Sequence, residues 1–130
     1  EALGKRVWLK SGGYLVIEPT EAMVVIDVNT GKYSGKKTLQ ETILKINLEA
    51  AVEIAHQIRL RNLSGIILVD FIDMEPGENR EILLKALSEA VSADPVKTAV
   101  VDMTKLNLVE MTRKKVRRPL HEQVIPGTEE

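Results

Sequence analysis

The 130-residue chain contains no cysteine, which excludes disulfide bonds and thiolate metal ligands. No apolar run approaches the roughly 18 residues that a membrane span requires, and no secretory signal is visible. Aromatic residues make up only 3% of the chain, so the core has to be built from Ile, Leu, Val and Ala. These absences are typical of a globular, cytoplasmic protein with no membrane partner.

The chain also lacks a strong net charge. Its formal charge of −1 argues, taken alone, against nucleic-acid binding. The distribution of the cations argues for it, because five of the six residues at 113–118 are Lys or Arg, and Lys32, Lys36 and Lys37 form a second group. A basic surface beside an acidic one suits a polyanion that is held next to a metal ion.

The hydrophobic patterns predict an α/β fold with one mixed sheet of about six strands. An amphipathic helix is expected at 38–62, opened by a capping box of Thr38 and Glu41, and a second helix at 78–93. The sixth strand is expected to return antiparallel beside the fifth. The predicted strands are 7–10 and 14–18, which form a hairpin around Ser11-Gly12-Gly13, then 23–28, 66–70, 98–101 and 108–112.

Two of these strands carry a carboxylate near their ends, Asp27 and Asp70. A strand, a helix and a strand in succession favour a parallel pair, which brings both aspartates to the same edge of the sheet. Neighbouring carboxylates repel unless a cation lies between them, and oxygen ligands suit Mg²⁺. Asn29 points to the same face as Asp27 and would bind a metal-bound water or a phosphate oxygen. The alternative, that each aspartate only caps the following loop, stays open.

Other motifs are weaker. The loop at 31–38 has too few residues between its glycines for a nucleotide P-loop, and we expect it to contact an RNA or DNA backbone. Asp73 and Asp102 are further metal candidates, although Asp102 suits a capping role. Asn47 lies close to the apolar stripe of the first helix, so its amide needs partners, either from the backbone or from the site.

Six blocks of the sequence stand out: VWLKSGG at 7–13, EA with IDVN at 21–29, NLEAA at 47–51, QIRLR at 57–61, VDFIDM at 69–74 and LVEMTR at 108–113. In this order they resemble the ribonuclease E/G family. The likeness runs from about residue 5 to 118, and the last block together with Val96-Lys97-Thr98 favours the ribonuclease G branch.

The resemblance covers the deoxyribonuclease-I-like catalytic subdomain of that family, here residues 1–118, followed by a polar tail at 119–130. Family members carry an RNase H-like region with an OB-fold RNA-binding domain and a 5′ sensor before this subdomain, and a zinc-binding Cys-Pro-x-Cys link after it. Neither region is in this chain, which also begins without methionine. We therefore expect the chain to be part of a longer enzyme, and we expect no zinc link here.

The resemblance implies a Mg²⁺-dependent endoribonuclease that cuts single-stranded RNA, leaves 5′-phosphate and 3′-hydroxyl ends, and acts in RNA processing and decay. By position, Asp27 and Asp70 match the Mg²⁺-binding aspartates, with Asp70 rather than Asp73 as the second ligand, and Asn29 matches the supporting asparagine. Lys97 falls where some members place an arginine that helps to hold the RNA 5′-monophosphate.

The sequence also leads to expectations about oligomeric state, alternative functions and RNA-binding residues. The full-length protein would be a homo-oligomer, either a dimer or a tetramer. Two alternatives to a nuclease remain, namely a non-cleaving RNA-binding or dimerisation scaffold and a Mg²⁺-dependent phosphatase of small substrates. The residues expected to bind RNA are Lys32, Lys36, Lys37, Lys97, Arg113, Lys114 and Lys115.

Overall fold

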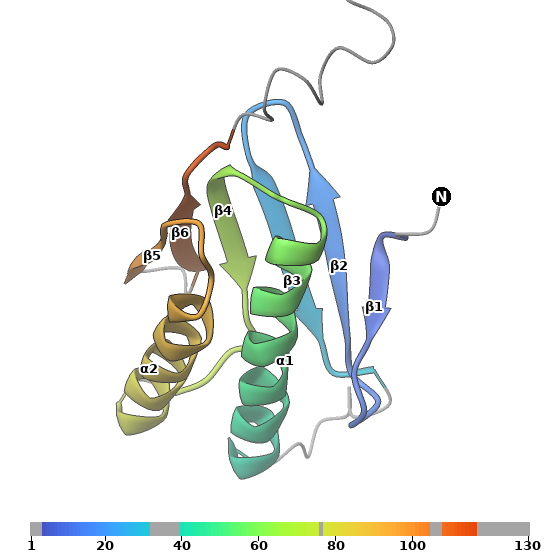
Figure 1. Cartoon of the computed structure of the whole chain (residues 1–130). Helices are drawn as coiled ribbons and strands as arrows, with labels where there is room; N and C mark the ends of the chain where they lie inside the picture. The colour runs from blue at the N-terminus through green and yellow to red at the C-terminus, as the bar shows by residue number, and fades with distance from the viewer. Residues whose placement is uncertain (1–3, 32–39, 76, 105–107, 117–130) are drawn as a thin grey trace, which may run out of the picture.

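Six strands of the described chain form one mixed sheet in the order β1-β2-β3-β4-β6-β5. The computed structural model describes residues 4–31, 40–75, 77–104 and 108–116. Two helices, α1 and α2, lie side by side over one face of the sheet (Figure 1). The elements are β1 Arg6–Trp8, β2 Tyr14–Pro19, β3 Val24–Asn29, α1 Gln40–Leu60, β4 Gly65–Asp70, α2 Glu78–Ser92, β5 Thr98–Met103 and β6 Leu108–Arg113.

The predicted α/β fold and its six-stranded mixed sheet are confirmed. β3 and β4 are the parallel pair, and α1 connects them. The remaining neighbours are antiparallel, including the β1–β2 hairpin and the return of β6 beside β5. Observed boundaries differ from the predicted ones by one or two residues, as fraying ends generally do. Thr38 of the expected capping box and the tail at 119–130 lie outside the described residues.

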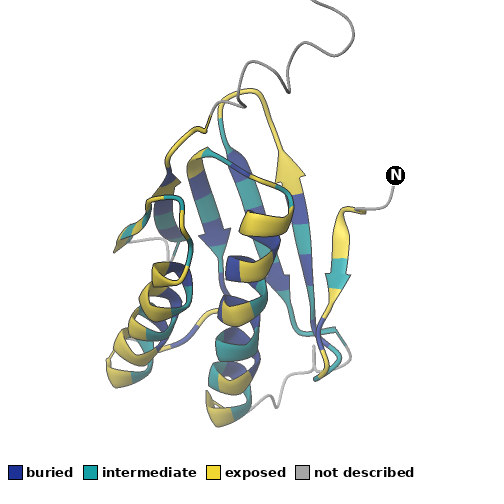
Figure 2. Ribbon diagram, in the orientation of Figure 1, coloured by how far each residue is buried: buried dark blue, intermediate teal, exposed yellow. Residues whose placement is uncertain are grey.

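The core is aliphatic, because alternate strand residues face the helices. Figure 2 shows the buried stripes on the strands beneath α1 and α2. Within the described residues, Phe71 is the one aromatic side chain in this core. The fully buried core side chains include Leu15, Ile17, Ile26, Ile46, Ile54, Ile58, Ile67, Val69, Leu83, Leu87, Val109 and Met111.

The opposite face of the sheet carries no helix among the described residues (Figure 1). Residues that alternate with the buried ones face this side. In β3 these are Val25, Asp27 and Asn29, and in β4 they include Leu68 and Asp70, all of them half-buried. Period-two alternation therefore places the two aspartates and the asparagine together on the helix-free face, where they are partly exposed to solvent.

Candidate active site

Asp27 and Asp70 stand directly opposite each other in the parallel register of β3 and β4. Adjacent strands lie about 4.8 Å apart, so the two carboxylates are immediate neighbours on the helix-free face. Asn29, two residues further along β3, donates a hydrogen bond from its Nδ2 to Oδ2 of Asp27 at 3.3 Å. The structure thus brings together Asp27, Asp70 and Asn29, which we predicted from the sequence to form one site.

The charges at this pair are not balanced by the described part of the chain. No lysine or arginine among those residues forms an ion pair with Asp27 or Asp70. Burial raises the pKa of Asp70 above its usual value, and the neighbouring charges of Asp27 and Asp73 raise it further. The pair therefore favours any cation that neutralises it.

The donor set indicates which cation would fit. The described residues contain no cluster of three or more His, Cys, Asp and Glu side chains. A site with two carboxylates and an amide has hard oxygen donors but too few of them to enclose a large ion. Mg²⁺ is bound in this manner in proteins, through one or two carboxylates while waters and substrate phosphate complete its shell. The residues present therefore fit Mg²⁺.

Asn47 of α1 holds the chain that leaves β4 just after Asp70. Its Nδ2 donates to the carbonyl oxygen of Ile72 at 3.0 Å, and its Oδ1 accepts from the Ile72 amide at 3.1 Å. Asn47 is fully buried, so these bonds satisfy an amide that would otherwise be costly to desolvate. The sequence left open whether the partners of Asn47 belong to the backbone or to the site. They are backbone groups of Ile72, two residues beyond Asp70.

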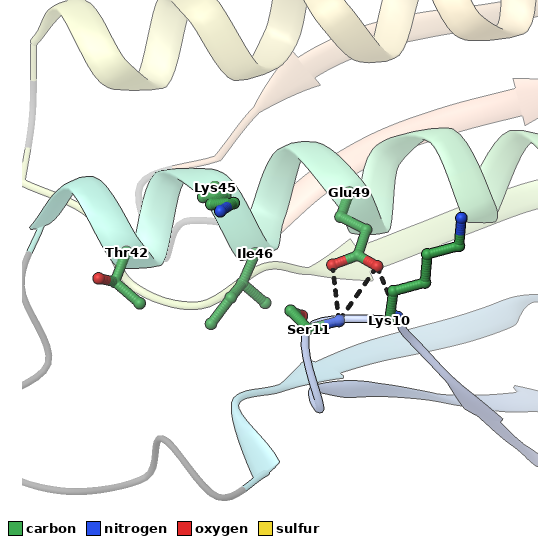
Figure 3. A pocket seen from close by; sticks show the side chains of 6 residues that line it. All are labelled: Lys10, Ser11, Thr42, Lys45, Ile46 and Glu49. Carbon is green, nitrogen blue, oxygen red and sulfur yellow. Dashed lines mark hydrogen bonds between the residues drawn. The ribbon is translucent and has the colours of Figure 1, made fainter.

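Glu49, two residues further along α1, holds the other side of the site. Its carboxylate accepts from the backbone amide of Lys10 at 2.6 Å and from that of Ser11 at 3.4 Å, as Figure 3 shows. A charged residue of an amphipathic helix ordinarily faces solvent, but the Glu49 carboxylate is used in this contact. Its partners lie 38 and 39 residues away in sequence, and no local pattern indicates such a contact.

The turn that Glu49 holds is packed against the end of β3. A Cβ atom on Gly13 would lie 2.7 Å from the carbonyl oxygen of Asn29. Gly31 has a φ of 64°, and a Cβ there would collide with the carbonyl oxygen of Gly12. Only glycine allows this approach, so the turn supports the backbone that carries Asn29.

A cavity of about 620 Å³ lies between this turn and α1 (Figure 3). None of its lining residues belongs to the carboxylate site, so the cavity does not mark the candidate active site. The cavity is lined by Lys10, Ser11, Thr42, Lys45, Ile46 and Glu49.

Comparison with known protein families matches residues 1–116 to the Ribonuclease E/G family. The chain belongs to the ribonuclease E/G family. It is 56% identical to ribonuclease G of Haemophilus influenzae and 51% identical to ribonuclease G of Escherichia coli K12, in each case over 119 residues that make up 92% of this chain. It is 49% identical to ribonuclease E of a Nostoc species over 122 residues, or 94% of the chain.

The chain spans only a part of these relatives. The matched region is 24% of the length of the two ribonuclease G proteins and 18% of the Nostoc ribonuclease E. Family membership therefore applies to the matched segment. None of the described helices is both long enough and apolar enough to cross a membrane.

For a member of the ribonuclease E/G family, the placement of the cations matters. Lys97, Lys114 and Lys115 are exposed, and the amide of Lys114 donates to the carbonyl oxygen of Lys97 at 2.9 Å. In the register, Leu108 lies opposite Asp70 and Arg113 opposite Gly65. The basic residues therefore lie at the other end of the strands, about 17 Å from the carboxylates at about 3.3 Å per residue.

The expectation of a basic run beside the carboxylate edge is therefore wrong for the described residues 113–116. Lys114 and Lys115 are separated from Asp70 by the length of a strand, because β6 is antiparallel to β4. The three lysines at this end remain exposed, as RNA contacts require. The other three lysines of the expected RNA-binding set, Lys32, Lys36 and Lys37, lie outside the described residues.

Arg113, which we had also expected to contact RNA, is committed to the protein interior. It is 5% exposed, and its Nε donates to Oδ2 of Asp94 at 2.8 Å. Its Nη1 donates to Oδ1 of Asn62 at 2.9 Å and to the carbonyl oxygen of Leu63 at 2.8 Å. Arg113 thus joins β6 to the segments that follow α1 and α2, and we remove it from the RNA-binding set.

The remaining acidic candidates lie outside the register pair of Asp27 and Asp70. Asp73 is exposed, three residues beyond Asp70, and its charge helps to raise the pKa of Asp70. Asp102 lies on β5, which β6 separates from β4, and its Oδ1 accepts from the amide of Met103 at 2.7 Å. This local bond agrees with the capping role expected for Asp102.

Proposed function

We propose that the chain is the catalytic domain of a Mg²⁺-dependent endoribonuclease. The enzyme would hydrolyse phosphodiester bonds of single-stranded RNA, leave 5′-phosphate and 3′-hydroxyl ends, and serve RNA processing and decay. The observation that carries this proposal is the register of Asp27 and Asp70, which places two carboxylates side by side without a described cation between them. Membership of the ribonuclease E/G family supports the substrate.

Asp27 and Asp70 would hold the metal. When bound, Mg²⁺ supplies the positive charge that neutralises a phosphate in an in-line displacement and lowers the pKa of a water. The oxygens of the two side chains are presented on the helix-free face, where an RNA strand can approach without displacing α1 or α2.

Asn29 would orient the reacting groups. Its amide is fixed by the hydrogen bond to Asp27, so it lies beside one carboxylate and would bind a water or a phosphate oxygen. Asn47 and Glu49 act behind the site, as positioning residues. They hold the backbone after Asp70 and the turn that supports Asn29, so both strand ends are fixed to the same helix.

A cleavage assay on a short, end-labelled single-stranded RNA tests this proposal. We expect cleavage with Mg²⁺, none with EDTA, and products with a 5′-phosphate and a 3′-hydroxyl. The Asp27→Asn, Asp70→Asn double variant should be inactive, while the matched Asp102→Asn variant should retain activity. Cutting in EDTA, or full activity in the double variant, would contradict the metal mechanism.

Two other results would favour different functions. RNA that binds but is not cut at any Mg²⁺ concentration would indicate a scaffold. Turnover of an aryl phosphate, without an effect of RNA, would indicate a phosphatase.

For the longer protein we propose a cytoplasmic homo-oligomer, either a dimer or a tetramer. Light scattering on that protein and its distribution between cell fractions test these two statements. A monomer in solution, or an enzyme recovered outside the cytoplasm, would reject the corresponding one.

A further inference from the structure

Three side chains form a compact cluster on β1 and β2, which we call the aromatic platform: Arg6, Trp8 and Tyr14. The rings of Trp8 and Tyr14 lie with their centroids 4.9 Å apart and their planes at 50°. The guanidinium carbon of Arg6 lies 4.3 Å from the Tyr14 centroid and 5.6 Å from that of Trp8. These distances are within the range of cation–π attraction, so the cation is held against the rings.

The platform lies on the same face as the carboxylates. Leu15 faces the core, and Val7 is its register partner, so the residues that alternate with them point to the helix-free side. Across the sheet, Trp8 pairs with Tyr14, and Tyr14 pairs with Asn29. The Cα atoms of Tyr14 and Asn29 are therefore about 5 Å apart. Asn29 is the hydrogen-bond partner of Asp27 in the site.

Arg6, two residues before Trp8 on β1, lies on the same face. Arg6 pairs with Val16, and Val16 pairs with Asp27. The platform and the metal pair thus occupy adjoining rows of one continuous surface. A flexible polymer held at Asp27 and Asp70 would reach the rings without crossing the edge of the sheet.

The exposure of Trp8 needs an explanation in this chain. Aromatic residues make up 3% of the sequence, yet its one tryptophan is 62% exposed on an edge strand. A solvent-facing indole with a guanidinium stacked beside it matches a nucleotide, because a base stacks on the ring while the cation attracts the phosphate. Leu60 of α1 is also exposed, but it is aliphatic and lies on a helix.

We propose that the aromatic platform is a base-stacking subsite for the single-stranded RNA whose scissile phosphate lies at Asp27 and Asp70. This inference rests on the proposed function, since it takes RNA as the substrate. The platform would grip a base next to the cleavage site, and the basic residues near Lys97 would contact a more distant part of the strand.

Trp8 allows a direct test, because it is the only tryptophan of the chain. The probe is a short oligoadenylate, added to the unmodified chain in EDTA so that no cleavage occurs. We expect saturable quenching of the Trp8 fluorescence. An abasic oligonucleotide of equal length should bind more weakly, as measured by the anisotropy of a label, and should not quench.

Single substitutions in the platform should lower the affinity for the labelled oligoadenylate. Trp8→Leu and Tyr14→Leu should each weaken binding roughly tenfold, the typical effect of losing one stacked base. Arg6→Gln should weaken it by about threefold and lower the salt-dependence slope by about one. The matched controls are Leu60→Ala and Arg59→Gln near the end of α1, which should bind normally.

Three results would overturn the inference. The first is binding of oligoadenylate without quenching of Trp8. The second is equal affinity for the abasic strand. The third is a Trp8 emission that shifts with protein concentration while the mass doubles, which would make the platform an interface between copies of the chain.

The nuclease proposal fails separately from the platform. Quenching by RNA without Mg²⁺-dependent cleavage would support the platform and reject the nuclease. Cleavage with unchanged KM in Trp8→Leu would reject the platform and keep the nuclease.

Discussion

Asp70 and Asp94 are two partly enclosed carboxylates in the same small fold, and their surroundings are opposite. Asp94 receives hydrogen bonds from Arg113, Val96 and Thr98, and the arginine contributes most to lowering its pKa to about 2. Asp70 faces a second carboxylate, and its pKa is raised by burial and by Asp27. The first carboxylate is neutralised within the fold, whereas the second has no cationic ion-pair partner among the described residues.

This contrast separates a structural carboxylate from a functional one. Arg113 and Asp94 neutralise each other with side chains that are 4% and 2% exposed. Asp27 and Asp70 instead share one row of the open face of the sheet. Burial of paired opposite charges is typical of structural sites, while neighbouring like charges without a partner are typical of sites that bind a ligand.

The largest expected effect is on the structural side. Arg113→Leu leaves Asp94 buried without its cation, and we expect a loss of about 3 kcal/mol in the free energy of unfolding, measured with urea. Lys114→Leu, at an exposed neighbour, should change it by less than about 0.5 kcal/mol. A stable Arg113→Leu variant that has lost RNA affinity would return Arg113 to the RNA-binding set.

A smaller effect is expected from the residue behind the metal site. Asn47→Ala leaves the buried backbone groups of Ile72 without partners, which should cost about 2 kcal/mol and weaken Mg²⁺ binding. Gln57→Ala is the matched control, because Gln57 is also a buried amide but its side chain bonds Glu53 and Arg61 of its own segment. Equal Mg²⁺ affinity in both variants would show that Asn47 does not position the site.

Removing one of the two like charges should stabilise the metal-free chain and weaken Mg²⁺ binding. Asp27→Asn relieves the repulsion at Asp70, so the metal-free variant should unfold at a higher urea concentration than the unmodified chain. Its Mg²⁺ affinity should fall by at least about tenfold, as measured by calorimetry. If Asp27→Asn is destabilising and binds Mg²⁺ normally, the pair is not the metal site.

A further expected effect is the acid dependence at Asp94. The pKa of Asp94 is lower in the folded protein than its ordinary value of 3.8, so its ion pair stabilises the fold above about pH 4. This contribution should be lost as the pH falls from about 4 to 2, through the folded pKa. Arg113→Leu should lack that part of the pH dependence in urea melts, and its persistence would assign it to another group.

Much of this fold was predictable, because the apolar patterns are simple. The residues around Ile26 and Ile67 form short apolar runs, which are typical of buried strands. The helix between these runs favoured a parallel pair, as observed. The same argument brought Asp27, Asn29 and Asp70 together. Local pattern therefore sufficed for the centre of the candidate site.

The misses have a common physical cause, namely contacts between residues far apart in sequence. Arg113 reads as one of several surface cations, but its partner Asp94 lies 19 residues away and its partner Asn62 lies 51 residues away. Glu49 reads as a solvent-facing helix residue, and the turn that it holds belongs to the first hairpin. The distance of Lys114 from Asp70 follows from the direction of β6, which the sequence suggested only relative to β5.

Binding of a divalent cation by Asp27 and Asp70 is tested by an NMR titration of the chain with Mg²⁺. We expect saturable shifts of the backbone amides of Asp27, Asn29 and Asp70, and their loss in the Asp27→Asn, Asp70→Asn double variant. Shifts centred on Asp102 and Glu110 instead, or shifts that persist in the double variant, would contradict it.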